Sequence, residues 1–175
     1  FFASEHKAGG KVTYKVIDNF LDQESFRAIK AAMESADFAW FYNDSVLFEK
    51  SDEELYDYQF THTLYNDSLP TSDYFFTFQP LWDKIKPISL IRVKANLNPI
   101  TPTHYYGGWH RDYKLQCNTA VYYMNTNNGW TEFKETGEKV ESVENRLLVF
   151  DSEMEHSGVT TTDTSARFLL NINYL

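Results

Sequence analysis

The second half of the chain is a succession of short segments rich in β-branched and aromatic residues, divided by turns. The segments that we expect to be strands are SLIRVKANLNP (89–99), CNTAVYYMN (117–125), WTEFKET (130–136), RLLVFDS (146–152) and ARFLLNINYL (166–175). Turn-forming residues at 127–129 and Gly137 separate the middle ones. Short strands at regular spacing predict an antiparallel sandwich or small barrel.

The first half mixes strand and helix signals. Residues 13–20 are expected to form a strand, and residues 21–36 an amphipathic helix that Asp22 can cap. Residues 72–87 are a second candidate helix, which Pro80 would bend or split. The predicted fold class is therefore mainly β with packed helices (α+β), the N-terminal helices supporting the sheet.

Length and composition bound this picture. A chain of 175 residues, 42% of them hydrophobic, fits one domain (1–175) with a sizeable core. The chemistry is expected in the β core at 89–175. Residues 1–10 have no signal-type apolar core and are expected to be disordered. No apolar run reaches the length that a membrane span needs, so no membrane association is expected.

Charge and cysteine content argue against two further classes of protein, nucleic-acid-binding proteins and disulfide-bonded proteins. The formal net charge of −9 and the pI near 5.0 argue against a broad phosphate-binding surface, so nucleic acid is not an expected partner. Cys117 is the single cysteine, so no intrachain disulfide can form. A reducing, intracellular (cytoplasmic) setting is expected from this.

The segment WHRDY (109–113) places a histidine and an aspartate on either side of Arg111. In a strand, His110 and Asp112 would point to the same side and could share one metal. His156 follows the 146–152 strand and can supply a third ligand. Two histidines and one carboxylate form the facial triad of non-haem Fe(II) oxygenases, which leaves three positions open for co-substrate and O₂. An isolated triplet of this kind is more often a surface histidine beside a solvated aspartate.

Arg167 lies near the start of the last predicted strand, where a barrel interior would not normally accept an unpaired cation. A dicarboxylate ligand would explain it, because the guanidinium fork matches a carboxylate with two parallel hydrogen bonds. The alternative is an arginine at the barrel rim, paired with an acid such as Asp163.

In this ordered set of motifs the sequence resembles the Fe(II)/2-oxoglutarate dioxygenases, and among them the prolyl 4-hydroxylase-like group. The matching segments are WHRDY (109–113), NTAVYYMNTNNGWTEF (118–133), ENRLLVFDSEMEHSGV (144–159) and ARFLLNINY (166–174). The resemblance covers roughly the C-terminal half of the chain. It implies a double-stranded β-helix, which is a distorted jelly-roll or cupin-like barrel.

The resemblance also implies roles for individual residues. The catalytic metal ligands are His110, Asp112 and His156, and Arg167 binds the far carboxylate of 2-oxoglutarate. Tyr123 is the best match for a tyrosine that hydrogen-bonds the same carboxylate, with Tyr122 as the alternative because the register is open by one residue. Where the group often has a tyrosine before the triplet, this chain has Asn96 and Asn98, either of which could take that place. The longer connection at 99–109 is expected to form part of a substrate rim or lid.

The activity that the resemblance implies is hydroxylation of a substrate C–H bond, coupled to oxidative decarboxylation of 2-oxoglutarate to succinate. The cofactors are Fe(II), 2-oxoglutarate and O₂, with ascorbate as a supporting reductant. The substrate is a peptidyl residue, proline being the first candidate, or a small molecule. The competing hypotheses are hydroxylation or demethylation of a nucleobase and a non-catalytic metal-binding β-barrel. The oligomeric state stays open.

Overall fold

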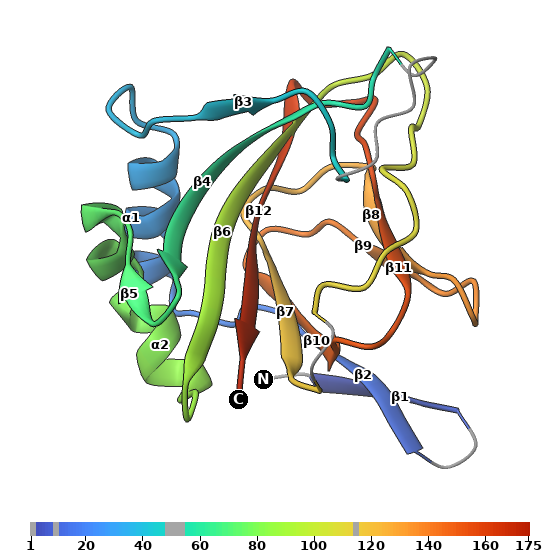
Figure 1. Ribbon diagram of the computed structural model, residues 1–175, viewed down its shortest axis with the longest axis horizontal. Helices are drawn as coiled ribbons and strands as arrows, with labels where there is room; N and C mark the ends of the chain where they lie inside the picture. Colours follow the sequence, from blue (N-terminus) through green and yellow to red (C-terminus); the bar gives the residue numbers. More distant parts are fainter. Residues whose placement is uncertain (1–2, 9–10, 48–54, 114–115) are drawn as a thin grey trace.

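The computed structural model of the protein describes residues 3–8, 11–47, 55–113 and 116–175 (Figure 1). These residues form two antiparallel sheets. The larger sheet has the strand order β1-β2-β10-β7-β12-β6-β4-β3, with β5 beside β4, and the smaller has the order β11-β8-β9. The strands are β1 (Ala3–Ala8), β2 (Lys11–Ile17), β3 (Phe41–Asn43), β4 (Gln59–Asn66), β5 (Leu69–Pro70), β6 (Leu90–Pro99), β7 (Asn118–Tyr123), β8 (Trp130–Phe133), β9 (Lys139–Glu141), β10 (Arg146–Asp151), β11 (His156–Val159) and β12 (Ala166–Tyr174).

The helices cover one face of the larger sheet, and the smaller sheet faces the other (Figure 1). Apolar side chains therefore form two buried clusters. The helix-side cluster joins Phe26 and Leu81 to Tyr122 of β7, while the cluster between the sheets joins Tyr123 of β7 to Phe133 of β8. Such a pair of packed antiparallel sheets with helices behind one of them confirms the predicted mainly β fold class.

Helix α1 (Gln23–Met33) forms where the sequence predicts it. The Asp22 side chain accepts a hydrogen bond of 2.9 Å from the backbone N–H of Ser25, which satisfies one donor that the first helical turn leaves unpaired. Phe26, Ile29 and Met33 recur at helical spacing and are all buried. The helix thus packs its apolar face onto the sheet.

The second predicted helix is split, as its proline indicates. The chain forms a 3-10 helix, η1 (Asp73–Phe78), and then α2 (Gln79–Ile85), with Pro80 in the first turn of α2. Proline is tolerated there because the first turn needs no N–H donor from it. The helix ends at Lys86, whose φ of 52° is left-handed.

The expectation that residues 1–10 are disordered is wrong for the described part of that segment. Ala3–Ala8 forms strand β1, which pairs antiparallel with β2. The edge of β2 would otherwise present unpaired backbone groups, and β1 satisfies them with its own. This pairing uses main-chain atoms, so the side-chain pattern gave no sign of it. Phe1, Phe2, Gly9 and Gly10 lie outside the described residues.

Of the helices in the described ranges, none is long and apolar enough to cross a membrane.

Candidate metal centre and co-substrate pocket

The three expected metal ligands come from two segments that meet antiparallel. His110 lies in the connection between β6 and β7, and His156 opens β11. Their backbones exchange two hydrogen bonds, each of 3.0 Å, between N–H and C=O groups. His110 makes only this isolated bridge, and Asp112 lies outside any strand. We expected strand periodicity to point His110 and Asp112 to the same side. In the structure the two residues lie in a loop instead, which His110 bridges to β11.

The side chains of this triad converge. One ligand atom from each of the three residues lies within 4.8 Å of the other two. Nε2 of His110 is 3.9 Å from Oδ1 of Asp112, and Nε2 of His156 is 3.7 Å from Oδ2. Only 5% of the Asp112 side chain and 4% of the His156 side chain are exposed, so the site is shielded on those sides.

Both imidazoles are held in the tautomer that a metal requires. Nδ1 of His110 lies 3.1 Å from the Gly108 carbonyl oxygen, and Nδ1 of His156 lies 2.9 Å from the Met154 carbonyl oxygen. A carbonyl only accepts, so each Nδ1 carries the proton and each Nε2 lone pair is left for the centre. Two neutral imidazoles and a carboxylate on one side fit Fe(II), and we conclude that these residues can hold it.

Asp112 is positioned by a second ring of polar groups. Asn171 donates a hydrogen bond of 3.0 Å to its Oδ2, and Arg92 donates one of 3.4 Å to its Oδ1. Burial alone would raise the pKa of this carboxyl, but the two imidazoles, Asn171 and Arg92 together hold the pKa below its usual value. The carboxylate thus stays ionised. Burial lowers the pKa of His156 as well, which favours the neutral, metal-binding form.

Arg167 lies in the interior of the protein. The residue is 2% exposed, and its guanidinium donates to the Ser142 hydroxyl (2.8 Å) and the Thr131 hydroxyl (3.0 Å). Among the described residues we find no acid paired with it, so the rim arginine bound to Asp163 is not what the structure shows. Burial lowers the pKa of the guanidinium, as expected for a cation without a neighbouring anion.

Two glycines make room for this side chain. A Cβ on Gly129 would lie 3.0 Å from Cδ of Arg167 and 2.7 Å from the Val159 carbonyl oxygen. A Cβ on Gly158 would lie 3.4 Å from Nη1 of the guanidinium. The turn before β8 therefore forms a cradle that only a residue without a side chain at position 129 leaves open, whereas Gly158 borders the guanidinium at an ordinary contact distance.

The two candidate tyrosines of β7 point to opposite faces of the larger sheet. The Tyr123 hydroxyl donates a 2.8 Å hydrogen bond to Thr131, which also binds Arg167. Tyr122 points to the helix side, where its hydroxyl donates a 2.7 Å hydrogen bond to Asn145. Tyr122 therefore lies on the face of the sheet away from the cavity, and the contact between Tyr123 and the co-substrate stays a prediction. Thr131 lines the pocket and Tyr123 lies behind it.

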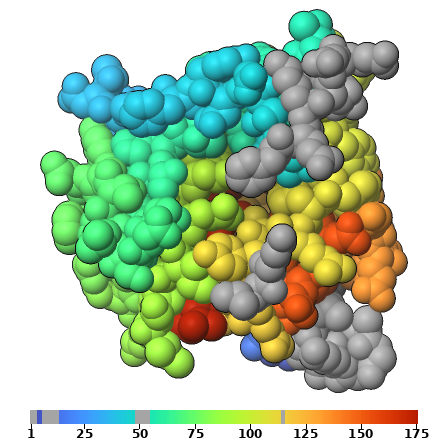
Figure 2. All heavy atoms as spheres, viewed as in Figure 1, coloured from blue at the N-terminus to red at the C-terminus, as the bar shows by residue number. Residues whose placement is uncertain are grey.

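The triad and Arg167 line one cavity of about 80 Å³, room for several water molecules and so for a polar ligand. Both candidate asparagines of β6, Asn96 and Asn98, line it too, as does the unexpected Lys94. Figure 2 shows the surface hollowed beside the yellow-green atoms of β6 and the yellow loop that follows. That loop contributes Tyr105 and Gly107 to the lining, in keeping with a substrate rim.

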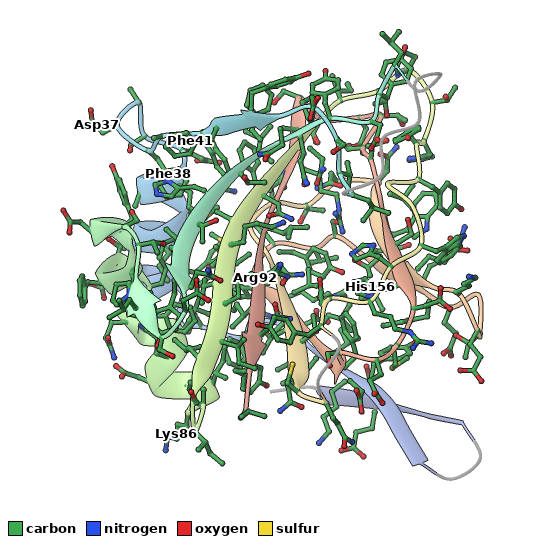
Figure 3. All side chains as sticks on the ribbon, in the orientation of Figure 1. Asp37, Phe38, Phe41, Lys86, Arg92 and His156 are labelled. Carbon is green, nitrogen blue, oxygen red and sulfur yellow. The ribbon has the colours of Figure 1, made fainter. Side chains whose placement is uncertain are left out.

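Sequence reasoning missed the polar residues that support the site. Arg92 and Lys94 precede the two asparagines of β6 at every second position, and Asn171 lies on the same face of β12 as Arg167, four residues after it. The alternation on β6 was visible in the sequence and indicated one polar wall. Thr131 and Ser142 carry no such signal, because small hydroxyl residues are frequent on any strand. Figure 3 shows Arg92 on β6 and His156 on β11, on opposite walls of the interior.

No protein-family model and no curated protein sequence matches the chain. Solved structures match it over nearly its whole length. A prolyl 4-hydroxylase of Pseudomonas putida superposes with a TM-score of 0.65 at 16% identity, over 93% of this chain and 91% of that one. A Trichoplax adhaerens prolyl hydroxylase, solved with a hypoxia inducible factor peptide fragment, gives 0.67 at 14% identity, over 93% and 83%.

The likeness extends to a different chemistry. The non-heme, α-ketoglutarate-dependent epimerase SnoN from nogalamycin biosynthesis superposes with a TM-score of 0.64 at 12% identity, over 93% of this chain and 77% of that one. Since prolyl hydroxylases and an epimerase share this fold, the fold by itself names no substrate. The chain has the double-stranded β-helix fold of the 2-oxoglutarate/Fe(II) oxygenases, and its His-Asp-His triad fits a 2-oxoglutarate-dependent dioxygenase.

Proposed function

We propose that the protein is a non-haem Fe(II)- and 2-oxoglutarate-dependent oxygenase that hydroxylates a substrate C–H bond while 2-oxoglutarate is decarboxylated to succinate. One observation carries the proposal: a metal-binding triad lines the same cavity as a buried arginine that has no acidic partner among the residues that the structure describes. A structural metal site would have no use for the arginine. A dicarboxylate that chelates the metal at one end would use both.

In the proposed reaction, different residues of the cavity have different roles. His110, Asp112 and His156 would hold Fe(II), which when bound supplies the redox chemistry with O₂. Arg167 orients 2-oxoglutarate through its far carboxylate, with Thr131 beside it and Tyr123 behind. The amides of Asn96 and Asn98 offer further donors on the β6 wall. The buried walls exclude bulk water, which strengthens each of these charge-based contacts.

The substrate is a peptidyl residue or a small molecule. Peptidyl proline is the first peptide candidate, because two of the similar structures are prolyl hydroxylases. A nucleic-acid substrate is disfavoured by the net charge of −9, since such binders need clustered cations.

The test is co-substrate turnover in the absence of substrate. Protein incubated with Fe(II), ascorbate and 2-oxoglutarate should form succinate slowly, and His110→Ala should form none. His104→Gln is the matched control, because this histidine bonds the Thr160 carbonyl and lies outside the triad. It should keep the wild-type rate. Equal rates for wild type and His110→Ala would refute the oxygenase assignment.

A further inference from the structure

Strand β6 presents an unusually polar wall to the cavity. Lys94, Asn96 and Asn98 line it at alternate positions, and Arg92 continues the row toward Asp112. Apolar residues would normally fill such positions in a small barrel. Polar groups buried there cost free energy unless they find hydrogen-bond partners. This row of polar residues on β6 therefore predicts that a ligand in the cavity presents polar groups to β6.

The two cations of this wall differ in their partners. Arg92 already has partners within the protein, because its Nε donates a hydrogen bond to Asn173 (3.1 Å) and its guanidinium donates one to Asp112. For the Lys94 ammonium, no hydrogen bond or ion pair is found within the described part of the chain. Burial and the charge of Arg92 lower the pKa of Lys94 to about 8, against the opposing effect of Asp112. Its charge is thus poorly compensated.

The charge of the cavity is opposite to that of the whole chain. The protein carries a net charge of −9, yet Asp112 is the one acid among the described residues that line the cavity. Arg167 and Lys94 are both cations in the same lining. In the proposed function the carboxylates of 2-oxoglutarate are matched by Arg167 and by the metal. Lys94 then remains as a positive charge beside the reacting centre.

The position of Lys94 places it next to that centre. Lys94 pairs across the sheet with Asn171 of β12, and cross-strand partners point to the same face. Asn171 in turn donates to the Asp112 carboxylate. The Lys94 stem therefore begins beside the residue that orients a metal ligand, on the wall away from the Arg167 end of the cavity.

We propose that Lys94 is a specificity-determining residue that binds a carboxylate of the substrate, so that the substrate is a small carboxylic acid rather than an internal residue of a peptide. The inference rests on the proposed function, whose substrate class it narrows. An ammonium and a carboxylate brought together in a shielded cavity neutralise each other and form charge-assisted hydrogen bonds. A neutral residue within a peptide would leave the Lys94 charge unpaired.

The experiment compares acids with their neutral counterparts. The probes are free L-amino acids, L-proline included, the corresponding L-amino acid amides, and N-acetyl-L-prolinamide as a mimic of an internal peptide residue. Succinate above the substrate-free rate and a gain of one oxygen in the probe are measured together. Binding of each probe to protein loaded with Mn²⁺ and 2-oxoglutarate, without O₂, is measured by calorimetry.

We expect at least one free acid to bind and be oxidised in preference to its amide and to the peptide mimic. Lys94→Met should weaken binding of that acid by about tenfold or more, the worth of a charged hydrogen bond. Lys94→Arg should restore part of it. Lys15→Met removes the same charge from an exposed ion pair with Glu5 and should have no effect.

The outcomes separate this inference from the proposed function. Absence of succinate in every reaction would refute the oxygenase, while calorimetry would still report on the Lys94 site. Equal binding of acids and amides, or no binding of any acid, would refute the role of Lys94. A parallel loss of 2-oxoglutarate affinity in Lys94→Met would instead assign the lysine to the co-substrate. Cooperative urea unfolding of Lys94→Met, like that of wild type, would show that the variant is folded.

Discussion

The side-chain amide of Asn171 donates a hydrogen bond of 3.0 Å to Oδ2 of Asp112, the only carboxylate of the triad. Asn171 shares β12, and the same face of it, with Arg167. A single strand therefore carries both the residue that aims the metal ligand and the residue that would anchor the co-substrate. The distance between the two ends of the site is set by the spacing of residues along one extended backbone.

Asn171→Leu should weaken metal binding. The substitution keeps the branched shape of the side chain but removes the donor that holds Asp112, and loss of such an outer partner typically costs about 10–100-fold in metal affinity. Calorimetric titration with Mn²⁺ measures it. Asn127→Ala, a buried asparagine of the turn before β8 that does not touch the triad, is the control and should bind Mn²⁺ like wild type. An unchanged affinity in Asn171→Leu would show that the hydrogen bond is only structural.

Arg167→Ala should separate co-substrate binding from metal binding. We expect 2-oxoglutarate affinity to fall by about two orders of magnitude, because a paired charge-assisted contact is lost. Mn²⁺ affinity should stay near the wild-type value, since Arg167 touches none of the three ligands and bonds Ser142 and Thr131 instead. Simultaneous loss of both affinities would mean that Arg167 maintains the fold rather than the co-substrate site.

The two tyrosines of β7 should behave differently when their hydroxyls are removed. Tyr122→Phe loses its hydrogen bond to Asn145 and should lower the free energy of unfolding by about 1 kcal/mol without changing 2-oxoglutarate affinity. Tyr123→Phe releases Thr131 beside Arg167 and should weaken 2-oxoglutarate binding roughly two- to tenfold. Urea unfolding and calorimetry distinguish the two. The reverse pattern would contradict the side assigned to each tyrosine.

Gly129→Ala should damage the arginine cradle. Its new Cβ would lie 2.7 Å from the Val159 carbonyl oxygen and 3.0 Å from Cδ of Arg167, so backbone and side chain must both move. We expect about 1–3 kcal/mol of destabilisation and weaker 2-oxoglutarate binding. Gly137→Ala is the comparison, because its φ of 68° is strained for alanine while no atom lies within 4 Å of the new Cβ. That variant should lose stability only, and weakened co-substrate binding in it would argue against the cradle.

Several local features followed from the sequence because their causes are local. Asp22 caps α1 through a neighbouring N–H, and Pro80 ends one helix and begins another through its own ring. Alternation along the last strand places Arg167 and Asn171 on one face, which follows from the amino-acid order alone. The triad was proposed from residue type and order, and the structure brings the three side chains together.

Other features depend on contacts between distant segments. Strand β1 forms because β2 has an open edge, and His110 faces the centre because β11 bridges it. The sequence of β2 does not indicate that β1 pairs with it, and the sequence around His110 does not indicate that β11 bridges it. The absence of an acid beside Arg167, among the residues that the structure describes, is likewise a property of the assembled interior.

The tyrosines of β7 show the division most clearly. Alternation dictates that Tyr122 and Tyr123 face opposite ways, and this much the amino-acid order determined by itself. Because β7 lies in the middle of the sheet, with helices on one face and the smaller sheet on the other, both side chains are fully buried and hydrophobicity cannot tell the faces apart. Only the packing of the helices against one face decided which tyrosine lies beside Arg167, and with it which face of the sheet holds the site.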